Sequence, residues 1–269
     1  MKSVAILGCG PAGLMVAHAA ALSNWDFRVY SRKQKSTLYG AQYLHQPIPN
    51  IECGGPRLVR YKLEGTPEMY RAKVYGDSWD GTVSPEDFME SHSAWDLRGA
   101  YNDLWFMYGD EVEDMDFRVL NSDKMMYYPI PWRQCDIVIS TVPRKIWAEP
   151  YDKFESMKVW ALGDTEHERV RLHRAQPFTV ECDGTEENDW YRVSNIFGYC
   201  TMEWPWDNYD LGFKPPPARG VSLVEKPLRH NSKAASDFIH LGRYGAWEKG
   251  ILTSDVFYQA MKIFANDRI

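Results

Sequence analysis

Residues 3–13 of the chain read SVAILGCGPAG, and this stretch decides the fold. Its first five residues form a short, β-branched apolar run, which is typical of a buried parallel strand. An Ala-rich segment at 14–22 predicts a helix, and residues 27–30 predict a second strand. Strand, glycine turn, helix and strand follow one another within about thirty residues, as a dinucleotide-binding βαβ unit requires.

The three glycines match the spacing GxGxxG of a phosphate-binding turn. Gly8 permits the tight turn, Gly10 lets a pyrophosphate approach the backbone, and Gly13 allows the helix to pack closely on the strand. Pro11 suits the first helical turn, where free N–H groups face the phosphates. We therefore predict that a dinucleotide is bound by Gly8, Gly10, Pro11, Ala12 and Gly13.

The end of the second strand departs from the usual pattern. An acidic residue normally stands about twenty positions after the glycines and holds the adenosine ribose. Here the position is Ser31, followed by the cations Arg32 and Lys33. Ser31 can hydrogen-bond a ribose hydroxyl, whereas Arg32 and Lys33 suit a 2′-phosphate, so NADP rivals FAD as the ligand.

Composition narrows the class of protein. The 269 residues carry a net charge of −6, which disfavours binding to duplex DNA through many phosphate contacts. Five scattered cysteines without a CxxC pair predict neither a zinc site nor a disulfide framework, and no other metal-ligand spacing is present. No run approaches the ~20 apolar residues of a membrane span, and the N-terminal run is broken by glycines. We expect a cytoplasmic protein without a membrane partner.

The remaining pattern predicts mixed α/β material between two nucleotide-binding ends. Strands are expected at 58–63, 70–75, 136–141, 158–162, 178–181, 190–200 and 238–241, and helices at 94–108 and 253–265. The predicted fold class is α/β, with a Rossmann-like parallel sheet and an inserted, reduced substrate domain. We assign residues 1–56, 136–165 and 236–269 to the nucleotide-binding domain, and 57–135 and 166–235 to the substrate or cap domain.

The C-terminal segment FIHLGRYGAW at 238–247, followed by Asp255, resembles the flavin motif of the UDP-galactopyranose mutase and amine oxidase branch of FAD proteins. Residues 136–143 and 190–195 are similar to two further strands of that branch. The chain is much shorter than typical members. The resemblance implies bound FAD, with Gly242 and Arg243 beside the flavin. It also implies a helix that begins near Thr253 and Ser254 and points its positive end at the isoalloxazine ring.

Candidate catalytic and substrate groups follow from this frame. Tyr244 and Trp247 belong to the closing segment and are catalytic candidates, with a core residue as the alternative role of Trp247. His45 is an acid/base candidate, with an ordinary polar loop histidine as the alternative. A loop with Gly40, Ala41 and Gln42 is expected to run beside the cofactor. The substrate candidates are Tyr191, Arg192 and Glu203, with a structural ion pair as the alternative role of Arg192.

Basic residues alternate at 169–174, and the pairs Arg60 with Lys62 and Arg71 with Lys73 have the same spacing. A solvated sheet face explains such spacing, and a phosphate-bearing substrate, nucleotide or single strand stays open as the partner.

The first hypothesis for function is an FAD-dependent oxidoreductase that takes a hydride from an amine- or alcohol-type carbon of a small molecule. The alternatives are a mutase-like flavoenzyme without net redox change, a flavin-dependent lyase acting on a modified nucleobase in phage DNA, and a flavin-binding sensor without turnover.

Overall fold

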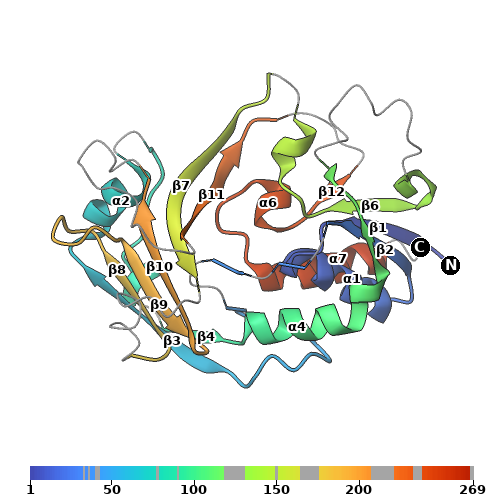
Figure 1. The fold of residues 1–269 in the computed structure, drawn as a ribbon, viewed down its shortest axis with the longest axis horizontal. Coiled ribbons are helices and arrows are strands. Elements are labelled where there is room, and N and C mark those ends of the chain that lie inside the picture. The colour runs from blue at the N-terminus through green and yellow to red at the C-terminus, as the bar shows by residue number, and fades with distance from the viewer. Residues whose placement is uncertain are drawn as a thin grey trace.

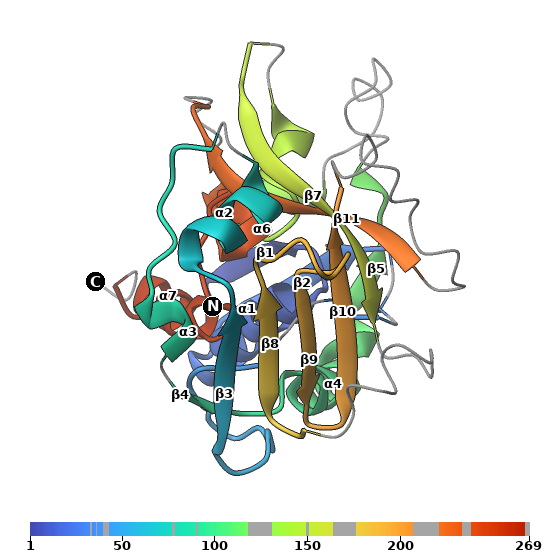
Figure 2. The same cartoon turned by 90° about the vertical axis from the view of Figure 1, so that its left-hand side faces the viewer.

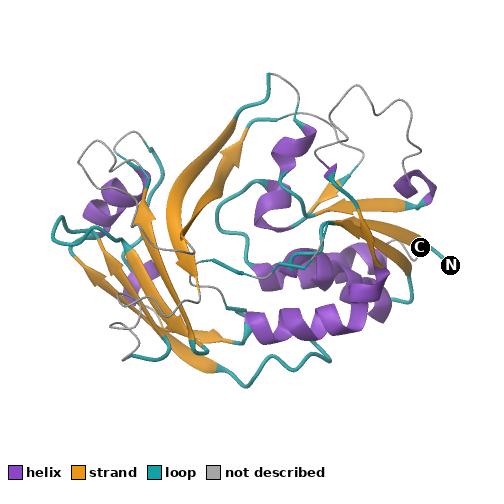
Figure 3. Ribbon diagram, in the orientation of Figure 1, coloured by secondary structure: helices purple, strands orange, loops and turns teal. Residues whose placement is uncertain are grey.

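The protein is built on two β-sheets, as its computed structural model shows (Figures 1 and 3). The structure describes residues 1–32, 34–35, 37–39, 43–76, 79–89, 91–117, 131–148, 151–163, 176–206, 221–232 and 238–266. In the view of Figure 1 the parallel sheet lies on the right and most of the second, mixed sheet on the left. None of the helices within these ranges has the length and apolar character needed to cross a bilayer.

The first sheet has five strands, all parallel, in the order β12-β6-β1-β2-β5. These strands are β1 (Ser3–Leu7), β2 (Asp26–Ser31), β5 (Val112–Asp114), β6 (Ile137–Ser140) and β12 (Ile239–His240). The apolar run of β1 is central, and its Ile6 lies between Val29 of β2 and Ile139 of β6. The prediction of an α/β fold around a parallel sheet is confirmed.

Three helices form the layer beside this sheet. Helix α1 (Pro11–Leu22) packs on β1 and β2 and also contacts α4 (Leu97–Tyr108) and α7 (Thr253–Asn266). Asp96 caps α4, because its Oδ1 accepts hydrogen bonds from the N–H groups of Arg98 and Gly99 at 2.9 and 3.0 Å. The N- and C-terminal segments of the chain therefore share one core.

The second sheet has seven strands in the order β11-β7-β10-β9-β8-β3-β4, and its strands β3, β8, β9 and β10 face the viewer in Figure 2. They are β3 (Arg57–Glu64), β4 (Ser91–Ala94), β7 (Phe154–Gly163), β8 (Thr179–Asp183), β9 (Arg192–Ile196), β10 (Tyr199–Pro205) and β11 (Val221–His230). Neighbouring strands are antiparallel except β3 and β8, which are parallel. The strand predicted at 190–200 is two strands, because Phe197 and Gly198 turn the chain with φ of 52° and 81°.

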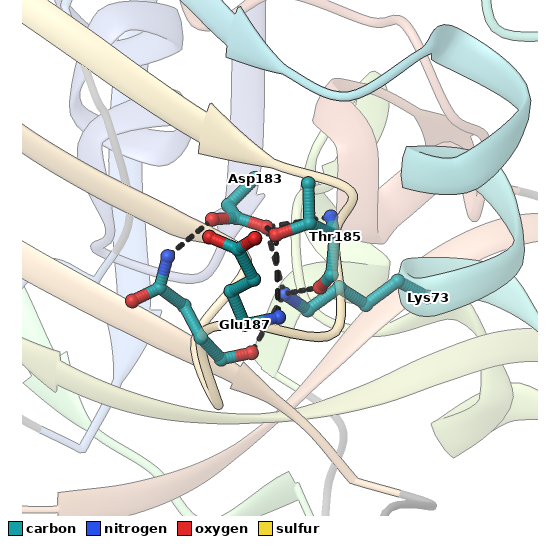
Figure 4. A network of polar contacts seen from close by, with 5 residues as sticks. Lys73, Asp183, Thr185 and Glu187 are labelled. Atoms are coloured by element: carbon teal, nitrogen blue, oxygen red, sulfur yellow. Dashed lines mark hydrogen bonds and ion pairs between the residues drawn. The ribbon is translucent and has the colours of Figure 1, made fainter.

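The strand predicted at 70–75 is wrong, because these residues form helix α2 (Pro67–Tyr75). Thr66 Oγ1 accepts a hydrogen bond from Met69 N at 3.3 Å, and Pro67 opens the first turn. Arg71 and Lys73 therefore do not share a strand face. Lys73 Nζ instead donates to Asp183 Oδ1 at 3.1 Å and holds α2 on the turn after β8 (Figure 4).

The shorter elements connect these sheets. They are α3 (Glu86–Met89), α6 (Gly242–Ala246) and the 3-10 turns η1 (Gly109–Glu111), η4 (Pro131–Gln134) and η5 (Arg144–Trp147). Sheet membership crosses the predicted domain ranges at two places. β5, within 57–135, pairs with β2 of the parallel sheet, and β7, within 136–165, pairs with β10 and β11 of the mixed sheet. The domain division itself stays a prediction.

The closest backbone approach in the described residues predicts a stability defect. A Cβ atom on Gly13 would lie 1.8 Å from the carbonyl oxygen of Gly8, which is backbone and has no rotamer to change. We expect Gly13→Ala to lower the free energy of unfolding by at least about 3 kcal/mol, the upper part of the range for overpacked sites. The measurement is urea denaturation followed by circular dichroism.

Gly55→Ala is the matched control, because a Cβ atom there meets nothing within 4 Å. We expect this control to change stability by less than about 0.5 kcal/mol. Equal denaturation midpoints for the two variants would contradict the close packing of α1 on β1.

Candidate functional site

The carboxyl ends of the five parallel strands meet at one edge of the sheet, where open α/β folds bind their ligands. The residues at or just after these ends are Gly8, Ser31, Asp114, Thr141 and Leu241. The edge therefore gathers positions that are far apart in the sequence.

The glycine turn follows β1 at this edge. Gly8 has a φ of +106° and its N–H donates to Tyr30 O at 2.8 Å, so the turn closes on β2. Gly13 packs on the carbonyl of Gly8, as the sequence predicted. The Cβ position of Gly10 has no protein atom nearer than the Lys35 side chain, whose Cε lies 3.7 Å away. The turn is thus closed by backbone at Gly13, whereas at Gly10 the nearest described neighbour is the flexible end of the Lys35 side chain.

The first turn of α1 presents Pro11 and Ala12 directly after Gly10. No side chain caps the helix, so its first N–H groups remain available to an anion.

The two ends of the chain meet at the glycine turn. Gly242 has a φ of +76°, and a Cβ atom on it would lie 3.1 Å from the Cβ of Ala12. The same position is 3.5 Å from Val256 of α7, whose first turn carries Thr253 and the fully buried Ser254. Gly242 therefore lies between the first turn of α1 and the first turn of α7.

At the end of β2, Ser31 stands beside Asp114 of β5 in the strand register. The Arg32 guanidinium lies 3.6 Å from the carboxylate of Asp116. The Arg32 cation, which the sequence suggested for a 2′-phosphate, therefore already has a carboxylate partner. Lys33 lies outside the described residues.

Helix α6 turns its side chains toward the mixed sheet. One terminal nitrogen of Arg243 donates to Pro227 O at 3.2 Å, and Tyr244 OH donates to Glu225 O at 3.0 Å. Both acceptors belong to β11, so α6 joins the two sheets.

Trp247 differs from the catalytic role expected of it. Its side chain is only 1% exposed, and its indole N–H donates to Glu155 O at 3.0 Å. Its ring packs edge-on against Phe154 at 5.4 Å between centroids. This environment gives Trp247 a packing role, because the ring has no open face toward a substrate.

The three predicted substrate residues form a buried charge cluster on the mixed sheet, completed by Lys226. Glu203 on β10 forms ion pairs with Arg192 of β9 and Lys226 of β11. Tyr191 OH donates to Glu203 Oε2 at 2.8 Å and accepts from Lys226 Nζ at 3.2 Å. The Nε atoms of Arg192 and Arg243 are buried and have no hydrogen-bond partner among the described residues.

The cluster shifts the ionisation of its members. Burial alone raises the pKa of Glu203, but the charges of Arg192 and Lys226 outweigh it and bring this pKa down to about 2. Burial, together with the charge of Arg192, lowers the pKa of Lys226 to about 7. The cluster holds one carboxylate for two cations, so its net charge is positive when Lys226 is protonated.

A cavity of about 360 Å³ lies between α2 and β7. Its wall includes Tyr75, Met157, Trp206 and Leu228. Met157 is the cross-strand neighbour of Lys226. Burial raises the pKa of Tyr75, and the positive charges of Arg192 and Arg243 partly oppose this rise. Tyr75 is therefore within electrostatic range of both arginines.

His45 lies in a group of rings, 4.5 Å from Tyr43 and 5.9 Å from His92 between centroids. Burial is the largest cause that lowers the pKa of His45, followed by His92. The ring is therefore neutral at pH 7 and can accept a proton.

The structure does not cover every predicted residue. Gly40, Ala41, Gln42 and the basic stretch at 169–174 lie outside the described residues. The sequence did not predict Lys226 as the fourth member of the charge cluster, because its partner Glu203 is distant in the chain.

Comparisons with solved structures agree with this fold over nearly the whole chain. 2,6-Dihydroxypyridine-3-hydroxylase from Arthrobacter nicotinovorans is similar at a TM-score of 0.55 and 11% identity, covering 99% of this chain and 84% of the hydroxylase. A flavoprotein/dehydrogenase from Cytophaga hutchinsonii gives 0.53 and 10%, with 98% and 78% covered. HpxO from Klebsiella pneumoniae, solved in complex with FAD, gives 0.50 and 10%, with 98% and 81% covered.

No protein-family model and no curated protein sequence matches the chain. The chain thus has the fold of these flavoproteins, and the structural comparisons do not support the narrower mutase and amine oxidase branch.

The charge cluster predicts a large and pH-dependent stability effect. We expect Glu203→Gln to lower the free energy of unfolding by about 3–5 kcal/mol, because Arg192 and Lys226 lose their buried counter-charge. The folded pKa of about 2 lies below the ordinary 4.5. The advantage of glutamate is therefore complete above about pH 4.5 and disappears as the pH falls toward 2. Urea denaturation across this pH range measures it.

Glu181→Gln is the control, since Glu181 pairs with Lys62 at 3.8 Å on a more exposed part of the mixed sheet. We expect a change below about 1 kcal/mol there. A Glu203→Gln protein as stable as the control at pH 7 would disprove the role of the cluster.

Proposed function

We propose that the protein is an FAD-dependent oxidoreductase. The observation that carries the proposal is the meeting of the glycine turn with Gly242 and the first turn of α7 at the carboxyl edge of the parallel sheet. This edge is the ligand site of open α/β sheets, and the same fold holds FAD in HpxO.

The residues present fit a flavin dinucleotide. No described backbone lies against the Cβ position of Gly10, where only the flexible Lys35 side chain is near, and a diphosphate there would accept hydrogen bonds from the free N–H groups of the first turn of α1. Ser31 and Asp114 offer hydrogen-bond acceptors to the ribose at the ends of β2 and β5. When bound, FAD supplies the electron transfer that side chains cannot perform.

Arg32 favours FAD over NADP as the resident ligand. Its cation is paired with Asp116 at 3.6 Å, so a 2′-phosphate would compete with a carboxylate for it.

The substrate is proposed to lie on the mixed sheet, near the buried charge cluster. Arg192 and Arg243 carry unpartnered N–H groups that suit an anionic substrate group. Glu203 orients Arg192 through their buried ion pair. Tyr191 is hydrogen-bonded to Glu203 and to Lys226, so it holds the carboxylate in place. Tyr244 and His45 remain the proposed polar groups beside the reacting carbon.

For the reaction, hydroxylation is favoured over hydride removal from an amine or alcohol. The support is the whole-chain likeness to 2,6-dihydroxypyridine-3-hydroxylase. In that reaction the substrate C–H, O2, a reduced nicotinamide and one proton give C–OH, water and the oxidised nicotinamide. Neither the mutase-like reaction nor the nucleobase lyase has a comparable observation in its favour.

Two spectroscopic experiments test this proposal. The purified protein should absorb in the visible as oxidised flavin, and denaturation should release FAD. Under anaerobic conditions a hydroxylase should lose its colour with reduced nicotinamide, whereas an amine or alcohol oxidoreductase should lose it with substrate alone. A colourless protein that binds NADP tightly would refute the proposal, and bleaching by an amine or alcohol alone would refute hydroxylation.

The glycine turn predicts the effect of one substitution on cofactor content. Gly10→Val should purify without FAD, because its branched side chain would fill the space beside the turn where the diphosphate is proposed to lie. The ratio of flavin to protein absorbance measures this loss. Gly55→Val, at a site with nothing within 4 Å, should keep its FAD. Full flavin content in a folded Gly10→Val protein would show that the turn does not bind the phosphates.

A further inference from the structure

One cation at the glycine turn has no counter-charge. The Cε and Nζ atoms of Lys35 lie 3.7 and 3.9 Å from the Cβ position of Gly10, where the turn has no described backbone against it. Lys35 forms no ion pair with any residue that the structure describes. Lys226 and Lys73, two lysines with buried side chains, are by contrast each paired with a carboxylate.

The segment that carries Lys35 is held in place by three hydrogen bonds. Lys35 N donates to Tyr101 OH at 3.0 Å, and Arg98 donates to Leu38 O at 2.7 Å. The hydroxyl groups of Tyr39 and Ser222 lie 2.7 Å apart. The first two anchors come from α4 and the third from β11, so the position of Lys35 does not depend on its own side chain.

Tyr101 also ties this segment to the glycine turn. Its hydroxyl accepts from Lys35 N and donates to Cys9 O at 2.9 Å. Burial is the largest of the causes that bring the pKa of Tyr101 to about 12, so the hydroxyl stays protonated and keeps its donor at neutral pH. The bridge fixes the distance between the backbone of Lys35 and the turn.

We propose that Lys35 binds the diphosphate of the dinucleotide and that Tyr101 is its positioning residue. This inference rests on the proposed function and adds a residue that selects ligands with a diphosphate. An ammonium beside the turn is complementary to two phosphates held by helix N–H groups. Neighbouring protein groups partly desolvate the Lys35 ammonium and thereby lower its pKa. The charged form is thus disfavoured while no anion is bound beside it. A bound anion removes that disadvantage.

The test is the dissociation constant of FAD, measured by equilibrium ultrafiltration of the purified holoprotein. We expect Lys35→Met to weaken FAD by about 10- to 100-fold, the effect of one hydrogen bond to a charged group. Lys35→Arg should restore most of the affinity. Tyr101→Phe should weaken FAD by about 2- to 10-fold, as for one neutral hydrogen bond. Lys62→Met, a cation of the mixed sheet paired with Glu181, should leave the affinity unchanged.

Riboflavin, which lacks both phosphates, separates a phosphate contact from a structural role. Lys35→Met should bind riboflavin as tightly as the wild-type protein does. Equal losses for FAD and riboflavin, or an unchanged FAD affinity in Lys35→Met, would overturn the assignment while FAD binding by the wild type still stands. A wild-type protein without affinity for FAD would overturn the proposed function and the assignment together.

Discussion

The contact between Gly13 and the carbonyl of Gly8 is the constraint on which the rest of the structure depends. It brings the first turn of α1 onto the end of β1, closer than any side chain would allow. Once α1 is fixed there, its buried face meets α4 and α7, so the last helix of the chain packs beside the first. The position of the C-terminal segment depends on this packing, because Gly242 contacts Ala12 in the first turn of α1.

The contact between the two sheets depends on hydrogen bonds as well as on close backbone packing. Helix α6 is too short to carry a core of its own, and it is held through single hydrogen bonds to the backbone of β11. Gly245 lets α6 approach β6, with its Cβ position 2.5 Å from Ser140 O. Arg243 thus lies between the carboxyl edge of the parallel sheet and the buried charge cluster. In the proposed reaction this is the place where flavin and substrate must meet.

The sequence predicted the parts of the structure that depend on near neighbours. The βαβ start is local, so its strand, turn and helix could all be read from residues 3–30. Helix α2 was missed because the alternation at 70–75 outweighed the Thr66-Pro67 start signal. The partners of Lys226 and Lys35 could not be predicted, since Glu203 and Gly10 are brought to them by the sheet order and by α4. Burial likewise decided the packing role of Trp247.

The departure at Ser31 has a physical consequence for ligand selection. A carboxylate at the end of β2 would recognise a ribose by its hydroxyl groups. This chain has an uncharged side chain there and a paired cation next to it, while Lys35, which has no ion pair among the described residues, faces the glycine turn. In the proposed complex, recognition is thereby moved along the ligand, from the ribose toward the phosphates. Phosphate contacts are charge-assisted and stronger than hydroxyl contacts, but they do not distinguish one dinucleotide from another. In the proposed complex, specificity for the flavin is then left to the closing segment at Gly242 and α7.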